Sequence, residues 1–443
     1  MPGGRPIKSL AFGRCSCENA SGMNGMPFRN SPDSRKMVVA WALVAAWTAV
    51  LFLAIPFARA LQDRLERFAG PRVYLAAASV LGLSCILAML AGLVRGPRTR
   101  VVRRVGTLIL LGCLSAGVLL TQLQTSAEAV HFFEYGLLGF LMFRAWRHHV
   151  GDALIYPISA ACLGLVAWLD EFLQWLMPGR FWDFRDIRLN AMAGAIVLAC
   201  MALVFPCSEL QGPISGKSVR RLCYLAWAML LALGLALSNT PARVDWYAAR
   251  IPLLHFLLNN ESVMSEFGHR HVDPEIGTFF SRLSRTELPR IDGERGAEVG
   301  RILVRDHAMI RPRDFRKTYT VSDDPFRHEF FRHLIQRDHY FAAGGQYRAT
   351  DPARYRHHLA VARHENQLLE KYFPQALDSA GCRWDADRQA HCAEQPEDAL
   401  PFVSEVSDHL VTGMTELEWW LVLGTLAGGV GWGYARWGKE PRR

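Results

Sequence analysis

Charged residues are missing from several long stretches of this 443-residue sequence. Residues 40–58 and 73–94 contain none, and each stretch is close to the ~20 apolar residues with which a helix crosses a bilayer. Residues 239–416, in contrast, are as rich in charge as a soluble domain. The composition therefore excludes an ordinary soluble chain and predicts a membrane protein with one sizeable soluble insert.

Cysteines are scarce in the charged insert, which excludes a disulfide-rich scaffold there. Of the ten cysteines, only Cys382 and Cys392 lie in residues 239–416. An isolated pair outside the cytoplasm most simply forms a disulfide. We therefore predict that Cys382 and Cys392 close a surface loop, with two free thiols as the alternative.

The sequence has no basic stripe of the kind that binds nucleic acid. The net charge is +9, but residues 239–416 contain 23 Lys and Arg against 27 Asp and Glu, so the positive excess lies in the membrane part. Basic residues in short loops stay on the cytoplasmic side of a membrane. The basic excess thus reflects membrane topology and predicts no nucleic-acid partner.

Eight apolar stretches are predicted to span the membrane. The fold class is an all-α polytopic membrane protein, with a mainly helical insert between the seventh and eighth helices. The first span is predicted to be an uncleaved helix, although Ala58-Arg59-Ala60 imitates a signal-peptidase site. Residues 1–36 show no periodicity and are predicted to be a disordered tail. The predicted spans lie near residues 37–58, 72–94, 105–122, 129–146, 154–176, 187–205, 219–238 and 417–437.

Basic residues in the short loops predict the orientation of these spans. Arg144 and Arg147 after the fourth span, and Lys217 before the seventh, are placed on the cytoplasmic side. Both termini are then cytoplasmic, and residues 239–416 lie outside. The arginines after the first span disagree with this pattern, and LQDRLERFAG is interpreted as a short amphipathic helix on the membrane surface.

With this topology, polar residues from three spans converge at the outer leaflet. An ionisable group at bilayer depth costs about 2.5–3.5 kcal/mol, so several together indicate a paired or water-filled pocket. Gly194, on the same predicted helix face as Asn190, would let neighbouring helices approach closely. The predicted pocket consists of His131, Glu134, Tyr135, Glu171, Gln174, Arg180, Asp183, Asp186 and Asn190.

Several roles remain open for this cluster. It can brace the fold, with Arg180 paired to Glu171 or Asp183. It can bind an anionic headgroup, with the Arg180 guanidinium on a phosphate and His131 orienting other oxygens. A hydrolase or transferase acting on a lipid phosphate, or a transporter, are further alternatives. The sequence shows no nucleophile or metal-spacing motif, and we predict no cofactor and no metal.

The spacing of these residues resembles the VanZ-like family. The residues that carry the resemblance are H-x3-Y at His131, E-x2-Q at Glu171, and PGR-x2-D-x2-D-x3-N-x3-G from Pro178 to Gly194. These motifs fall within residues 105–205. The resemblance implies a multi-pass protein of the bacterial inner membrane with a cell-envelope role, linked through the family's name to teicoplanin resistance, and it implies no particular reaction.

The other segments are additions to this module. They comprise two spans at residues 37–104, a seventh span within residues 206–238, the insert at 239–416, and a last span with a basic tail at 417–443. In the last span, Gly424, Gly428, Gly429 and Gly433 have the spacing of close helix contacts, either with the bundle or with a second copy.

The insert is predicted to be mainly helical. Asp324-Pro325 and Asp351-Pro352 each place an N-cap acid before a proline at the first helical position. Residues 301–310, RILVRDHAMI, are predicted to form a strand. Twelve of the fifteen histidines lie here, but His328-Glu329 with His333 departs from the zincin spacing and favours solvated or capping histidines. In the rival reading, the protein is a non-catalytic scaffold whose insert binds periplasmic partners.

Overall fold

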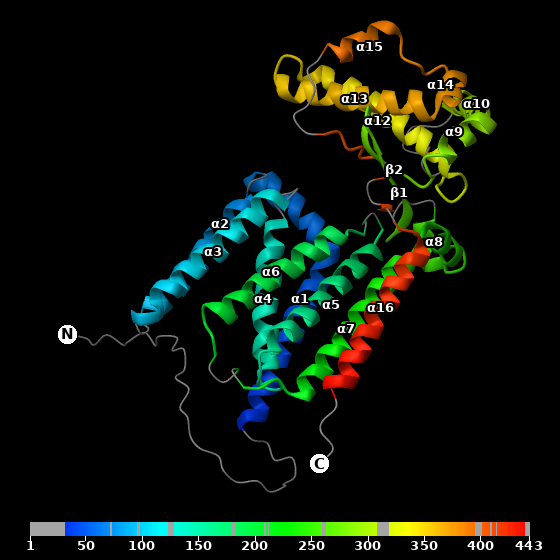
Figure 1. Cartoon of the computed structure of the whole chain (residues 1–443). Helices are drawn as coiled ribbons and strands as arrows, with labels where there is room; N and C mark the ends of the chain where they lie inside the picture. Colours follow the sequence, from blue (N-terminus) through cyan, green and yellow to red (C-terminus); the bar gives the residue numbers. More distant parts are fainter. Residues whose placement is uncertain are drawn as a thin grey trace.

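The computed structural model describes residues 32–70, 73–94, 98–122, 128–178, 180, 182–207, 210, 212–258, 263–307, 319–394, 401–407, 410–412 and 414–438. Within these residues the chain is mostly helical, and the mostly helical fold class is confirmed. Two parts are visible (Figure 1). A bundle of long helices, called the membrane bundle, carries at one end a smaller part, called the helical domain, which comprises residues 241–412.

All eight predicted spans fall on helices of the membrane bundle. Among the described residues, four segments are long and apolar enough to cross a membrane: Ser34–Ala58, Ile155–Trp175, Phe184–Leu203 and Gly216–Ser238. Several membrane-length helices are therefore present, and the count of eight spans stays a prediction. The helices are α1 (Pro32–Ala69), α2 (Val73–Val94), α3 (Arg98–Gln122), α4 (Glu128–Trp146), α5 (Ile155–Trp175), α6 (Phe184–Leu203), α7 (Gly216–Ser238) and α16 (Glu416–Trp437).

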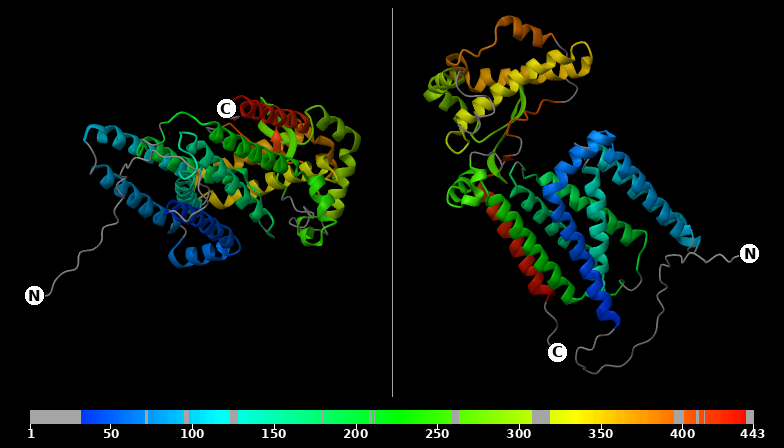
Figure 2. Two further views of the ribbon diagram at one scale, coloured as in Figure 1. Left: turned by 90° about the horizontal axis from the view of Figure 1, so that it is seen from below. Right: turned by 180° about the vertical axis from the view of Figure 1, so that it is seen from behind.

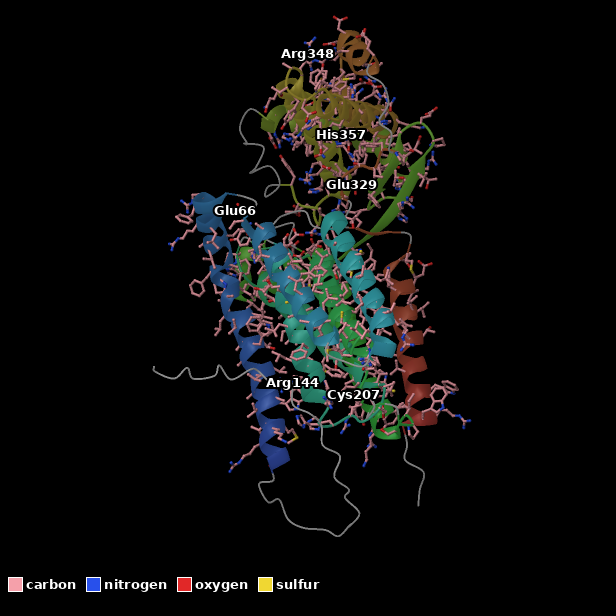
Figure 3. All side chains as sticks on the ribbon, turned by 90° about the vertical axis from the view of Figure 1, so that its left-hand side faces the viewer. Glu66, Arg144, Cys207, Glu329, Arg348 and His357 are labelled. Atoms are coloured by element: carbon pink, nitrogen blue, oxygen red, sulfur yellow. The ribbon has the colours of Figure 1, made fainter. Side chains whose placement is uncertain are left out.

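Helix α1 is longer than the sequence predicted at both ends. It begins at Pro32, so residues 32–36 are helical instead of disordered, while residues 1–31 of the predicted tail lie outside the described residues. It continues past Pro56 to Ala69, so the predicted surface helix is the last part of α1. Glu66 in this part accepts a hydrogen bond from Gln62 Nε2 at 2.9 Å and lies at the end of the bundle that faces the helical domain (Figure 3).

Helix α4 packs against α1, α5 and α6 in the interior of the bundle. Tyr135 and Leu138 of α4 share a buried cluster with Leu163 of α5 and Ala193 of α6. Glycines bring α4 and α6 together: a Cβ atom at Gly139 would lie 3.1 Å from Gly194 Cα, and one at Gly194 would overlap the Leu163 side chain. The predicted close approach at Gly194 is confirmed.

The last helix, α16, lies side by side with α7 (Figures 1 and 2). Trp227 Nε1 of α7 donates to the Ala427 carbonyl at 3.2 Å, and Gly234 of α7 packs on Trp420. The predicted glycine positions are not part of this contact. Within the described residues, a Cβ atom added at Gly424, Gly428 or Gly429 would meet nothing within 4 Å, and one at Gly433 would meet only Trp437 of the same helix.

The helical domain joins a helix pair to a small sheet. The sheet has the order β2-β1-β3, with β1 antiparallel to β2 and parallel to β3. The elements are α8 (Pro241–Ala248), η2 (Pro252–Leu257), β1 (Glu266–Asp273), β2 (Gly277–Ser281), α9 (Glu287–Ile291), η3 (Asp292–Gly296), α10 (Ala297–His307), α12 (Pro325–Tyr347), α13 (Pro352–Tyr372), α14 (Pro374–Ser379), α15 (Ala386–Ala393) and β3 (Leu410–Thr412).

The two predicted helix starts in this domain are confirmed. Asp324 caps α12 by accepting from the Arg327 N–H at 3.2 Å, and Asp351 caps α13 by accepting from the Arg354 N–H at 3.0 Å. The predicted strand at 301–310 is wrong, because residues 301–307 belong to α10 and 308–310 lie outside the described residues. Val299 and Leu303, four residues apart, both face the same core, which favours a helix.

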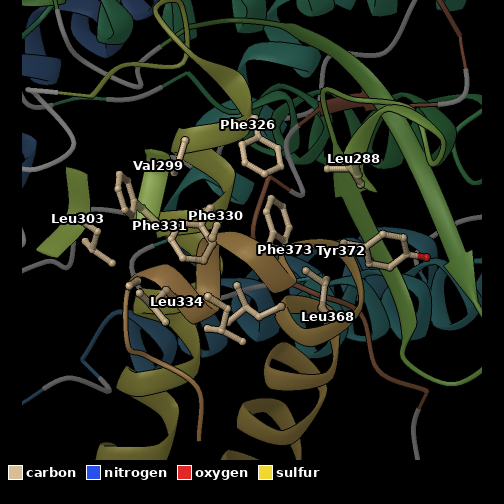
Figure 4. Close-up of a cluster of buried hydrophobic side chains, with 14 of the residues drawn as sticks. Leu288, Val299, Leu303, Phe326, Phe330, Phe331, Leu334, Leu368, Tyr372 and Phe373 are labelled. Atoms are coloured by element: carbon tan, nitrogen blue, oxygen red, sulfur yellow. The ribbon is translucent and has the colours of Figure 1, made fainter. Parts of the chain in front are cut away.

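The core of the helical domain is aromatic. Helix α12 contributes Phe326, Phe330 and Phe331. They pack on Leu368 of α13 and on Phe373, the first residue after α13 (Figure 4). These side chains are buried, and the apolar area that they remove from water stabilises the helix pair.

The predicted disulfide is wrong, because Cys382 and Cys392 are both free thiols in the structure. They lie in different apolar clusters. Cys382 packs against the aromatic core, whereas Cys392 is buried with Leu359 and Trp384. Burial raises the pKa of the Cys392 thiol to about 11, so this thiol stays protonated at neutral pH.

Asp273, at the end of β1, is the most heavily hydrogen-bonded carboxylate that ties the sheet to α13. Its side chain is fully buried and accepts from the Tyr372 hydroxyl at 2.7 Å, from Lys371 Nζ at 3.1 Å and from Arg285 at 3.1 Å. Burial alone would raise the pKa of Asp273, but the hydrogen bonds from Tyr372, Lys371 and the Glu275 N–H outweigh it and lower the pKa to about 2.

The depressed pKa predicts how the domain responds to acid. A group whose pKa is lower in the folded state stabilises the fold above its unfolded pKa, and the contribution is lost as the pH falls through the folded value. We expect the stability that Asp273 provides to be complete above its ordinary pKa of 3.8 and to disappear as the pH falls to about 2. Hydrogen exchange of β1 and α13 in the full-length protein measures this stability as a function of pH. In Asp273→Asn, the stability should fall less between pH 3.8 and about 2. An unchanged acid profile in the variant would contradict the assignment.

Candidate functional site

The predicted pocket residues all come from one end of α4, α5 and α6. Helices α4 and α6 begin, and α5 ends, at the end of the bundle that faces the helical domain (Figure 1). The nine predicted residues therefore lie on three neighbouring helix ends and on the connection between α5 and α6. We call this group, together with Glu128, Asp170 and Arg185, the polar cluster.

Four polar side chains form the buried part of the polar cluster. Tyr135, Asp170, Glu171 and Asn190 are each at most 4% exposed. The Asp170 carboxylate lies beside the Tyr135 hydroxyl and accepts from Gln174 Nε2 at 3.3 Å. Because a buried carboxylate is stable only with hydrogen-bond partners, these contacts explain how α5 tolerates Asp170.

Glu171 connects α5 to the start of α6. Its Oε1 accepts from the Asp183 N–H at 2.8 Å, whereas its Oε2 is buried and has no hydrogen-bond partner within the described residues. Asp183 has extended backbone angles and is the N-cap of α6, since its Oδ1 accepts from the Arg185 N–H at 2.7 Å. The acids of this region thus fix where α6 begins.

The remaining side chains form an accessible part beside the buried acids. The side chains of His131 and Asp183 are 44% and 46% exposed, and Glu134 and Asp186 are partly exposed. His131 Nδ1 lies 3.1 Å from Glu134 Oε2, one helical turn away on α4. Arg180, in the connection, donates to Gln174 Oε1 at 2.7 Å.

Arg185 was missed in the sequence, although it holds the cluster together. Its guanidinium forms two hydrogen bonds with the Glu128 carboxylate, at 2.9 and 3.1 Å, and lies 3.4 Å from both Asp183 Oδ2 and Asp186 Oδ1. It therefore links the first turn of α4 to the first turn of α6. The family motif leaves position 185 unspecified, and Glu128 lies just before the predicted span, so neither residue stood out.

Asp170 was also left out of the predicted set. Its signal in the sequence is the acidic doublet Asp170-Glu171 within an otherwise apolar stretch. Only Glu171 belongs to the E-x2-Q motif, so Asp170 was not selected. Both are nevertheless buried, because one faces α4 and the other faces the connection to α6.

An aromatic group lies next to the buried acids. Trp168 and Phe172 of α5 stack with ring centroids 5.3 Å apart, and Trp168 meets Trp182 edge to face at 5.8 Å. The indole N–H groups of Trp168 and Trp182 are buried and have no hydrogen-bond partner in the described part of the chain. Buried polar atoms are nearly always paired, so these two donors and Glu171 Oε2 are unusual within the described residues.

The polar cluster is rich in acid. It contains six carboxyl groups, from Glu128, Glu134, Asp170, Glu171, Asp183 and Asp186, against the two arginines and His131. Carboxylates accept hydrogen bonds and attract cations, so the arrangement suits hydroxyl or ammonium groups. Among the residues that the structure describes, no three His, Cys, Asp or Glu side chains are grouped to hold a metal ion.

Comparison with known proteins agrees with the motif-based resemblance. Residues 40–205 match the model of the VanZ/LLP1 family. The match begins well before residue 105, so it includes α1 and α2, which the motifs alone left outside the module. No curated protein and no solved structure matches the chain. The matched segment, residues 40–205, is therefore similar to the VanZ/LLP1 family and carries the whole polar cluster from α4 to α6.

Proposed function

We propose that this VanZ-like protein binds the headgroup of an envelope lipid at its polar cluster, and that the headgroup is a glycolipid's. The observation that carries the proposal is the group of buried, unpaired polar atoms, Glu171 Oε2 and the Trp168 and Trp182 indole N–H groups. A sugar hydroxyl both donates and accepts a hydrogen bond, so one type of group satisfies all three atoms. The neighbouring ring faces offer apolar surface for the C–H faces of a sugar.

The charge balance favours a sugar over a bare phosphate as the main contact. Six carboxyl groups would repel a phosphate placed among them, and the Arg185 guanidinium is already engaged by Glu128. We place an anionic part of the headgroup at Arg180, which donates to Gln174 Oε1 and whose planar guanidinium has the fork geometry that suits a phosphate.

We also propose that the polar cluster lies at the outer leaflet of the bacterial inner membrane. Arg144, Arg147 and Lys217 occur at the end of the bundle opposite the helical domain, where Figure 3 labels Arg144 and Cys207. Basic residues favour the cytoplasmic side, which supports cytoplasmic termini and an external helical domain. The family link adds a role in the response to glycopeptide antibiotics, which growth of a deletion strain on teicoplanin tests directly.

Native mass spectrometry of the full-length protein tests headgroup binding. We expect the detergent-purified protein to retain a glycolipid, and Arg180→Ala to lower its occupancy about ten-fold, because one charge-assisted hydrogen-bond pair is worth about 1.5–3 kcal/mol. Arg188→Ala is the matched control, since Arg188 is an exposed arginine on the first turns of α6. The control should retain the lipid.

Other outcomes would replace the proposal. Unchanged lipid in Arg180→Ala, together with a lower melting temperature, would show that the polar cluster only braces the helices, as a scaffold protein requires. Turnover of a polyprenyl phosphate that Asp186→Asn abolishes would show an enzyme. Retention of a simple phospholipid without sugar would overturn the glycolipid assignment. The polar cluster would then still be a headgroup site, but for a phospholipid.

A further inference from the structure

The segment that leads from α7 into the helical domain has two different faces. This juxtamembrane segment, residues 241–257, consists of α8 and η2. On one face, Val244, Ala248 and Leu257 are buried against Trp175 of α5 and Ala236 of α7. The segment is therefore fixed to the membrane bundle and is not a flexible linker.

The opposite face of the juxtamembrane segment is exposed and apolar. On α8 it carries Trp246, which is 61% exposed, between two arginines at positions 243 and 250. Ile251 and Leu253 follow, and Leu253 is 83% exposed. Clustered exposed side chains of this size on a fixed segment indicate a surface that another phase or molecule covers.

The position of this face is set by contacts at the ends of two bundle helices. Arg243 donates to the Ser238 carbonyl at the end of α7 at 3.0 Å, and to Glu416 Oε1 in the first turn of α16 at 2.7 Å. Trp420 Nε1 donates to the same Glu416 oxygen at 3.3 Å. The exposed face is thus level with the helix ends, where tryptophan and arginine are typical of the boundary between lipid and water.

We propose that the juxtamembrane segment is an interfacial anchor, with Trp246, Ile251 and Leu253 inserted among the lipid headgroups of the membrane surface. Its chemistry matches this partner. The Arg250 guanidinium lies 4.5 Å over the Trp246 ring and donates one hydrogen bond to the Trp246 carbonyl. A guanidinium has five N–H donors, so it can also bind a lipid phosphate. Tryptophan, arginine and large aliphatic side chains on one face are the composition of helices that lie in the plane of a membrane.

Exposed apolar side chains also occur on the two bundle helices that adjoin the segment. The apolar side chains of α7 and α16, such as Leu231 and Leu421, are exposed on the bundle directly below the segment. A membrane that covers these side chains extends to α8 without a gap, because α8 begins three residues after α7 ends. The anchor therefore holds the helical domain at the membrane surface, with its buried face on the aromatic residues beside the polar cluster.

A depth-sensitive fluorescent probe tests the anchor in the full-length protein. A fluorescent amino acid that is excited apart from tryptophan is placed at Leu253, and the protein is assembled into lipid nanodiscs. Lipids with a quenching nitroxide near the headgroup should reduce its emission at least about two-fold. The matched control has the same probe at Val304, an exposed apolar residue of α10, where emission should not change.

The same measurement distinguishes the membrane from a second protein copy. Discs that hold one copy are compared with discs that hold two. Quenching of the probe at 253 in single-copy discs supports the lipid anchor. Arg250→Gln should reduce this quenching, and the reduction should be largest in discs of anionic lipid. The proposal would be overturned if the nitroxide lipids quenched the probes at 253 and 304 equally. It would also be overturned if the probe at 253 were shielded from solvent only in discs that hold two copies. Because Leu253 is exposed, the probe should leave folding intact, which circular dichroism verifies.

Discussion

Arg282→Ala is expected to lower the free energy of unfolding of the helical domain by about 3–5 kcal/mol. Arg282 follows β2, and its guanidinium lies 2.5 Å from Glu266 Oε2 and 3.2 Å from Glu329 Oε1. The side chains of all three residues are at most 8% exposed. Removing the arginine leaves two buried carboxylates without this cation, and hydrogen bonds such as that from Ser281 Oγ to Glu329 compensate only part of their desolvation. Hydrogen exchange in β1, β2 and α12 of the full-length protein measures the loss.

An exposed ion pair in the same domain provides the control for Arg282. Arg290 and Glu294 are 2.6 Å apart on the surface, and both side chains are 57% exposed. Because solvent screens such pairs, Arg290→Ala should change stability by less than about 1 kcal/mol. If Arg282→Ala and Arg290→Ala lowered the free energy of unfolding by similar amounts, the role of Arg282 would be contradicted. The buried ion pair would then contribute no more to stability than the exposed one.

The second large effect is expected at Gly194 in the membrane bundle. Gly194→Ala should lower the stability of the bundle by about 1–3 kcal/mol, because the new methyl group overlaps the fully buried Leu163 side chain. The backbone of α6 cannot move away freely, since Gly139 of α4 packs against Gly194 from another side. The melting temperature of the detergent-solubilised protein measures the effect.

Gly424→Ala is the matched control for Gly194. Gly424 lies in α16, and an added Cβ atom would meet nothing within 4 Å. Its melting temperature should stay the same or rise slightly, because alanine favours a helix more than glycine does. If Gly194→Ala melted like Gly424→Ala, the close approach of α4 and α6 would not be a source of stability.

The position of the polar cluster in the fold could be predicted from the sequence because the signals are local. Span limits follow from apolar length, and alternating spans place the start of α4, the end of α5 and the start of α6 at one membrane surface. The caps at Asp324 and Asp351 follow from a residue and its next neighbours. In each of these cases, the interaction that decides the structure lies within a few residues along the chain or repeats with the helix period.

The missed features depend on pairs that are distant in the sequence. Arg185 and Glu128 are 57 positions apart, and Arg282 and Glu329 are 47 apart, so no local pattern pairs them. The apolar residues of 301–307 suit a strand as well as a helix, and only the core against which Val299 and Leu303 pack decides between them. The disulfide prediction failed for the same reason, since sequence proximity does not show that Cys382 and Cys392 face different cores.

The helical domain leaves the membrane bundle after α7 and returns at α16, and these two helices are neighbours joined by the hydrogen bond from Trp227 to the Ala427 carbonyl. An insertion with adjoining entry and exit points can be gained, lost or exchanged in evolution without separating the helices on either side. The family match covers residues 40–205 and so ends before the helical domain begins. Related chains are therefore expected to carry the same membrane module with unrelated domains, or with a short loop, between the last two helices.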